Sequence, residues 1–153
     1  QKFIPELLPL FAPNVNSFRR FLPDTSAPVN VEWGEENRTV GLRVPDAGPQ
    51  NRRVENRLPG ADANPYLVLA ALLTSIEQGL DAKLEPIAPL NDDRESGVDF
   101  PKDMLDAVRR MQASERVAAG LGSEFVMVYC ENKRQDHLAF MHDINPREYR
   151  WYL

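Results

Sequence analysis

NRTVGLRVPDAGPQNRRVENRLPG, residues 37–60, concentrates basic side chains in a chain that is acidic as a whole. The stretch holds five arginines and one glutamate, which are Arg38, Arg43, Arg52, Arg53, Arg57 and Glu55. Guanidinium groups grip phosphate with two parallel donors, and a carboxylate offers the oxygen ligand that Mg²⁺ prefers. The stretch therefore predicts a site for a small polyphosphate and its metal ion.

The same stretch has the residue pattern of strands. Residues 40–44 alternate apolar side chains with small or polar ones, which is typical of a strand with one buried face. If residues 53–57 are extended as well, the two-residue period of a strand places Arg53, Glu55 and Arg57 on one face. The three side chains are then expected to act together.

Length and charge limit the class of protein. A chain of 153 residues has the size of one domain and can bury a core of its own. A formal net charge of −5 argues against a nucleic-acid or membrane-surface partner, which requires a basic footprint. Cys130 is the single cysteine, so no disulfide forms within the chain, and a reducing cytoplasm is the expected location. No apolar run in the sequence is long enough to span a bilayer.

Helix signals occupy both ends of the sequence. Residues 2–12 have helical apolar spacing but contain prolines, which predicts a short helix. Residues 64–79 begin with the start signal Asn-Pro and are apolar all round in their first turns, which predicts a buried helix. Residues 104–153 predict further helices, with breaks near Gly120 and Asn145.

Four blocks point to a known family. They are NSFRRFLPDTSAP at 16–28, NRTVGLRVP at 37–45, RRVENR at 52–57 and DANPYL at 62–67. In this order and at this spacing they closely resemble the C-terminal third of the catalytic domain of the glutamine synthetase family. The resemblance implies an α+β fold of antiparallel strands packed with helices and a helical C-terminus. It also implies that residues 1–153 are a C-terminal portion of that domain, with the N-terminal domain and part of the site outside the chain.

The resemblance implies an enzyme activity. Members of the family are ATP-dependent ligases that join the side-chain carboxylate of glutamate to an amine through a γ-glutamyl phosphate, with Mg²⁺ or Mn²⁺ bound. The transferring phosphoryl group gathers negative charge, which arginines and metal neutralise. Family members assemble as large rings, so a homo-oligomer is implied. The fragment alone is expected to be inactive, because other metal ligands and nucleotide contacts of the family lie upstream.

The family pattern also assigns residue roles. Arg20 looks like the residue that holds the α-carboxylate of glutamate, and Arg57 matches the arginine beside the reacting carboxylate and phosphoryl. Glu55 corresponds to a ligand of the magnesium or manganese ion. The implied clamp on the nucleotide phosphates consists of Arg38, Arg43 and Arg53. The implied catalytic residues are Arg57 and Arg38.

One position separates this chain from the ammonia-using members. Those enzymes carry a glutamate on a flap over the site, where this chain has Ser26. An alkyl amine can be located by its carbon chain and needs room instead of that carboxylate. The blocks look most like the γ-glutamylpolyamine branch, whose members attach glutamate to putrescine or similar amines. We hypothesise that Asp24 or Glu32 meets the distal ammonium of a diamine.

Three alternative interpretations stay open. Ordinary, ammonia-using glutamine synthetase is one. The arginines are also consistent with a solvated surface on which they form ion pairs with Glu35, Glu36 and Asp46, each pair contributing about 0–1 kcal/mol. The third is a noncatalytic assembly module that holds the helical C-terminus against neighbouring subunits and retains vestigial site residues.

Overall fold

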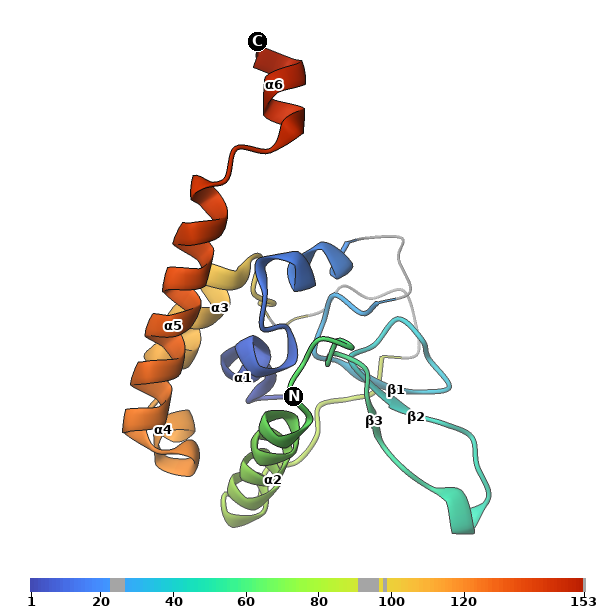
Figure 1. Cartoon of the computed structure of the whole chain (residues 1–153). Helices are drawn as coiled ribbons and strands as arrows, with labels where there is room; N and C mark the ends of the chain where they lie inside the picture. Colours follow the sequence, from blue (N-terminus) through green and yellow to red (C-terminus); the bar gives the residue numbers. More distant parts are fainter. Residues whose placement is uncertain (23–26, 91–96, 98, 153) are drawn as a thin grey trace.

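The computed structural model describes residues 1–22, 27–90, 97 and 99–152. Helices pack beside a small three-stranded sheet, and the long helix α5 runs along one side (Figure 1). The predicted α+β class is confirmed. In chain order the elements are α1 (Ile4–Phe11), η1 (Val15–Arg20), β1 (Trp33–Glu35), β2 (Leu42–Val44), η2 (Pro49–Asn51), β3 (Glu55–Asn56), α2 (Pro65–Asp81), α3 (Met104–Gln112), α4 (Glu115–Leu121), α5 (Ser123–His142) and α6 (Pro146–Tyr152).

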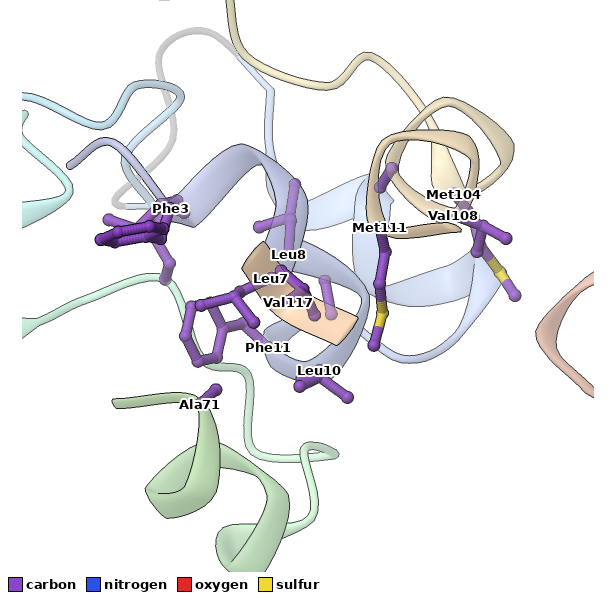
Figure 2. Packing of buried hydrophobic residues seen from close by; sticks show 14 of the residues in the cluster. Phe3, Leu7, Leu8, Leu10, Phe11, Ala71, Met104, Val108, Met111 and Val117 are labelled. Atoms are coloured by element: carbon purple, nitrogen blue, oxygen red, sulfur yellow. The ribbon is translucent and has the colours of Figure 1, made fainter. Parts of the chain in front are cut away.

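The core forms around α1. Seven of its eight residues are buried, because the helix is apolar on nearly all sides. Pro5 lies in the first turn, where the missing amide hydrogen has no helical partner to lose. Leu8 and Phe11 belong to one buried cluster with Met111 of α3 and Ala71 of α2 (Figure 2). The prediction of a short helix here is confirmed, and that helix is the centre of the fold.

Helix α2 departs from the prediction. Asn64 caps it as expected, since its Oδ1 accepts hydrogen bonds from the backbone N of Tyr66 at 2.9 Å and of Leu67 at 3.4 Å. The expected burial is wrong, however, because within this helix only Ala71 and Thr74 are buried. Its largest exposed apolar side chains are Tyr66, Leu69, Leu73, Ile76 and Leu80. An apolar surface all round shows that a helix needs partners, but it does not identify them.

The sheet is mixed. β2 and β3 pair antiparallel, with Arg43 directly opposite Glu55, in agreement with the expected antiparallel arrangement. β1 and β2 instead pair parallel, with Trp33 opposite Leu42. Parallel neighbours usually need a connection of about a dozen residues or more, whereas the chain returns here through residues 36–41. This short loop carries Arg38.

The C-terminal third is helical, as predicted. α4 ends and α5 begins at Gly122, whose φ of 93° favours glycine. The sequence prediction misses a break between α3 and α4, where the Ser114 hydroxyl accepts a hydrogen bond from the backbone N of Val117 at 3.2 Å. α6 begins at Pro146, as predicted. None of the helices in the described ranges combines the length and hydrophobicity that a bilayer crossing requires.

Segment 81–101 has a loop pattern in the sequence, and its described part after α2 contains neither helix nor strand. This segment is attached to β1. The backbone N of Leu90 donates to the Trp33 carbonyl oxygen at 2.7 Å, and the Trp33 indole N donates to the Ile87 carbonyl oxygen at 2.6 Å. The loop therefore covers the outer edge of the small sheet.

Cys130 lies in the core, on the inner face of α5, and is 1% exposed. Burial raises the pKa of its thiol to about 11. At pH 8 roughly one thiol in a thousand is then the reactive thiolate. We predict that Ellman's reagent modifies the native chain far more slowly than the chain unfolded in guanidinium chloride, measured by absorbance. Equal rates would contradict this packing of α5.

Candidate functional site

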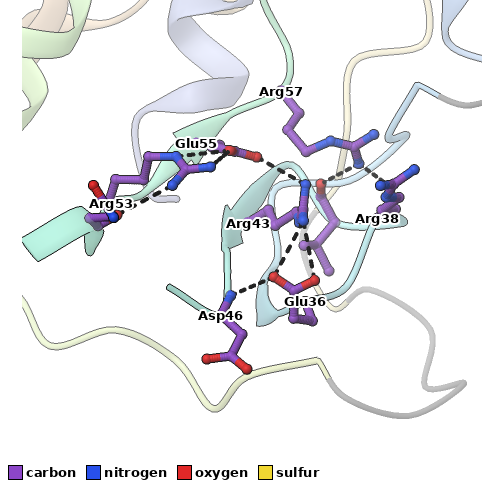
Figure 3. Close-up of polar contacts among 9 residues, drawn as sticks. Glu36, Arg38, Arg43, Asp46, Arg53, Glu55 and Arg57 are labelled. Carbon is purple, nitrogen blue, oxygen red and sulfur yellow. Dashed lines mark hydrogen bonds and ion pairs between the residues drawn. The ribbon is translucent and has the colours of Figure 1, made fainter. Parts of the chain in front are cut away.

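The carboxylate of Glu55 is the centre of the candidate site. The strand register places Arg43 opposite it, and Arg43 Nη1 donates to Glu55 Oε2 at 3.2 Å. Arg53 donates to Glu55 Oε1 from Nε at 3.1 Å and from Nη2 at 2.9 Å. Figure 3 shows both guanidinium groups pointing at this carboxylate. Their common direction confirms that Arg53 and Glu55 share a face.

A second carboxylate holds the other side of Arg43. Glu36 follows β1 and accepts from Arg43 Nη2 at 3.2 Å and 3.3 Å. It also accepts a hydrogen bond from the backbone N of Asp46, which together with Arg43 lowers the pKa of the Glu36 carboxyl. The ion-pair interpretation is thus confirmed for Arg43 and Glu36. Arg43, whose side chain is 17% exposed, is fixed between two carboxylates.

Arg57 holds the loop that carries Arg38. Its Nη1 donates to the carbonyl oxygens of Arg38 and of Val40, the latter at 3.3 Å, and its backbone N donates to Gly41 O at 2.9 Å. Burial first, and then the like charges of Arg43 and Arg38, lower the pKa of the Arg57 guanidinium. A bound anion would relieve this repulsion, so the cluster favours a negatively charged ligand.

Arg20 lies at the end of η1 and contacts the segment that follows β3. Its Nη2 donates to Arg57 O at 2.9 Å, and its Nη1 donates to Leu58 O at 3.0 Å. A Cβ added to Gly60 would lie 3.0 Å from this Nη1, so the turn after β3 approaches Arg20 closely. Arg20 is therefore joined to the segment that carries Arg57. Its contact with a substrate carboxylate stays a prediction.

The fit of a metal ion can be judged from the donors present. In the described ranges no three His, Cys, Asp or Glu side chains gather as ligands. Glu55 supplies one carboxylate with a 30% exposed side chain, and Mg²⁺ is often held by one or two carboxylates plus substrate phosphates. Both Glu55 oxygens accept hydrogen bonds from arginine side chains. A cation therefore fits this carboxylate once those arginines bind another anion, such as a phosphate.

Other predicted residues either lie outside the described part of the chain or make no contact with Glu55 that the structure shows. Asp24 and Ser26 lie outside the described residues. Glu32 is 5% exposed and accepts a hydrogen bond from the backbone N of Gly97 at 3.2 Å, so its proposed contact with an amine is untested. Arg52 is exposed and follows η2.

Sequence patterns do not identify Asn30 as a residue that organises the site, and they suggest Glu36 only as an ion-pair partner of the arginines. Asn30 falls between two valines, where alternation predicts a solvent-facing side chain, but it is only 9% exposed. Glu36 has a positive φ of 50°, which positions its carboxylate under Arg43. No periodicity marks either residue, because each acts through a contact that only the folded loop creates.

Comparisons with known proteins identify relatives. The family model "Glutamine synthetase, catalytic domain" matches residues 1–152. Gamma-glutamylputrescine synthetase PuuA of Escherichia coli (strain K12) is 40% identical over 98% of this chain and 32% of its own length. Gamma-glutamylethanolamide synthetase GlnA4 of Streptomyces coelicolor is 38% identical over 86% of this chain and 29% of its own. The chain thus spans about a third of the length of the curated relatives it matches.

Two solved structures have a fold similar to that of this chain. Apo GmaS without ligand aligns with a TM-score of 0.84 at 31% identity and covers 99% of this chain and 35% of its own. The GmaS/ADP complex aligns with a TM-score of 0.83 at 31% identity, over 99% of this chain and 37% of its own. With a family model matched along nearly its whole length and relatives of this similarity, the chain belongs to the glutamine synthetase family.

Proposed function

We propose that this chain is the C-terminal portion of the catalytic domain of an ATP-dependent ligase that joins glutamate to an amine. The observation that carries the proposal is the convergence of Arg43 and Arg53 on Glu55, beside Arg38 and Arg57, in a member of this family. Several relatives are named as glutamate–amine ligases, and a related structure is titled as an ADP complex. The rest of the site is proposed to lie in the part of the enzyme that this chain does not span.

The first step is phosphoryl transfer. A γ-carboxylate oxygen of glutamate attacks the γ-phosphorus of ATP, and the bond from that phosphorus to ADP breaks. Charge accumulates on the phosphoryl and leaving oxygens, and donors fixed beforehand stabilise it with little reorganisation. We assign the nucleotide phosphates to Arg38, Arg43 and Arg53. Carboxylates already hold two of these side chains, since Arg43 is paired with Glu36 and Glu55 and Arg53 with Glu55.

The second step transfers the γ-glutamyl group. The neutral amine attacks the acyl carbon of γ-glutamyl phosphate, the acyl C–O bond to phosphate breaks, and the amine nitrogen loses a proton. We assign Arg57 and Arg38 to the reacting oxygens and Arg20 to the α-carboxylate of glutamate. Each terminal nitrogen of an arginine carries two hydrogens, so a carboxylate contact is compatible with the backbone bonds of Arg20.

Glu55 is proposed as one ligand of Mg²⁺ or Mn²⁺. When bound, such an ion would neutralise phosphate charge and orient the transferring group. Arg43 and Arg53 now satisfy the Glu55 carboxylate, so arrival of a metal-bound triphosphate would exchange one set of opposite charges for another. This exchange explains why the arginines and the metal ligand share one surface.

We propose putrescine or a similar alkyl amine as the acceptor. The support is the 40% identity to the gamma-glutamylputrescine synthetase and the serine at position 26. The glutamate–isopropylamine ligase of Pseudomonas sp, at 38% identity, favours the same class of acceptor. Ammonia is the alternative, since Type-1 glutamine synthetase 2 of Dictyostelium discoideum is 34% identical.

An amine panel tests the acceptor. We expect ADP release by the complete enzyme to show a kcat/KM for putrescine at least about ten times that for ammonium, because a pocket for an alkyl chain gains binding energy from each methylene. Spermidine and ethanolamine complete the panel, and omission of glutamate is the control. A preference for ammonium would overturn the assigned branch. Absence of ADP release with every amine would overturn the ligase proposal itself.

We also propose that the complete enzyme is a ring-shaped homo-oligomer. Helix α6 extends away from the body of the chain (Figure 1) and exposes Tyr149 at 54%, Trp151 at 66% and Tyr152 at 76%. Exposed aromatic side chains of this size are typical of protein–protein interfaces. The subunit number stays open.

A further inference from the structure

One buried amide holds the base of the loop that carries Arg38. Asn30 precedes β1, and its Nδ2 donates to the Thr39 carbonyl oxygen at 3.0 Å. Its Oδ1 accepts from the backbone N of Glu32 at 3.0 Å and of Gly41 at 3.2 Å. A single side chain thus joins the strand that enters the loop to the segment that returns from it.

Arg57 holds the same loop from the other side. Along residues 38–41, the first, third and fourth carbonyl oxygens accept hydrogen bonds from Arg57, through its side chain twice and its backbone N once. The second carbonyl oxygen accepts the bond from Asn30. Four successive acceptors are therefore satisfied by two residues, which restricts the loop to one conformation.

Close packing leaves the loop little freedom. A Cβ added to Gly41 would lie 2.5 Å from the Asn30 carbonyl oxygen, so the two chain segments touch at a position that only glycine fits. At the tip, Asn37 Oδ1 accepts from the backbone N of Thr39 at 2.8 Å, and its Nδ2 donates to Leu90 O at 2.7 Å. The Arg38 side chain is exposed, so its direction depends on this backbone.

We propose that Asn30 is a positioning residue for Arg38. It fixes the 37–41 loop so that the Arg38 guanidinium faces the ligand phosphates before they arrive, and it acts from the core side without touching the ligand. The inference rests on the proposed function, in which Arg38 contacts phosphate. Donors that are held in place in advance stabilise a transition state more than mobile ones, and a misplacement of about 1 Å can lower a rate about a hundredfold.

The substitution Asn30→Asp in the complete enzyme tests this role. Aspartate keeps the size and the acceptors of asparagine, but it removes the Nδ2 donor and sets a carboxylate oxygen against the Thr39 carbonyl oxygen. We expect kcat/KM for ATP to fall about 10- to 100-fold, while KM for the amine changes less than about threefold. If this variant does not fold, Asn30→Ser, whose hydroxyl is too short to reach Thr39, replaces it in every comparison.

A matched control separates positioning from general destabilisation. Asn64→Ala removes the N-cap of α2, an asparagine whose Oδ1 also accepts backbone hydrogen bonds but which lies outside the loop. We expect it to lower the melting temperature without changing kcat/KM for ATP. An equal loss of kcat/KM in both variants, or no loss in the Asn30 variant, would overturn the inference.

A double-mutant cycle with Arg38→Ala distinguishes this inference from the proposed function. If Asn30 acts through Arg38, adding the Asn30 substitution to Arg38→Ala should cost less than about threefold further. Fully additive losses would overturn the positioning role while leaving the ligase proposal intact. An Arg38→Ala enzyme with unchanged kcat/KM for ATP would instead contradict the role proposed for Arg38.

Discussion

Replacing Glu55 by alanine in the complete enzyme is expected to lower amine-dependent ADP release about 10²- to 10³-fold. The substitution removes the proposed metal ligand and also the carboxylate on which Arg43 and Arg53 converge. Arg53 then loses its carboxylate partner and Arg43 keeps only Glu36, so both guanidinium groups are expected to shift from the phosphate positions. The measurement is kcat at saturating ATP, glutamate and putrescine.

Two further variants test whether the loss of activity depends on the charge of Glu55 and on its position. Glu55→Gln keeps the volume of the side chain and removes its charge, so it should lose nearly as much activity as alanine. Glu131 is a matched control, because it accepts hydrogen bonds from Arg134 at 2.9 Å and 2.7 Å and belongs to α5, a helix that lies away from the sheet (Figure 1). Glu131→Ala should leave kcat unchanged. An active Glu55→Ala enzyme would favour the noncatalytic assembly module.

The sequence predicts the local part of the site. Arg53 and Glu55 are two residues apart in an extended segment, and a strand period of two is a property of the backbone, so their shared face follows from spacing alone. The pairing of Arg43 with Glu55 does not follow in this way. It depends on the register of β2 against β3, which the long connection between them leaves open in the sequence.

Sequence periodicity likewise does not predict the parallel pairing of β1 with β2. It requires the chain to double back within a few residues, and the buried side chain of Asn30 stabilises that return by joining both sides of the loop. An asparagine between two valines is read from sequence as the solvent side of a strand. Its burial and its hydrogen bonds depend on tertiary contacts, so the sequence pattern does not predict the conformation of the loop that carries Arg38.

Burial of the two apolar helices differs most from expectation. The sequence of α2 is apolar all round and that of α1 is broken by prolines, yet α1 is the buried helix and α2 keeps a long exposed apolar face. The hydrophobicity of a helix indicates how much stability its burial would contribute. The arrangement of the other elements decides which face of the helix is buried. In the described chain, α3 and α2 flank α1, as Figure 2 shows for Met111 and Ala71.

This difference predicts unequal costs for the same substitution in the 153-residue chain. Leu8 of α1 is 0% exposed, so Leu8→Ala removes buried methyl groups and leaves a cavity, and we expect the free energy of unfolding to fall by about 2–5 kcal/mol. Leu69 of α2 is 57% exposed, so Leu69→Ala should cost no more than about 0.5 kcal/mol. Urea denaturation followed by circular dichroism measures both. A cost for Leu69→Ala as large as that for Leu8→Ala would mean that the outer face of α2 is covered in solution, whereas a small cost for Leu8→Ala would contradict α1 as the centre of the core.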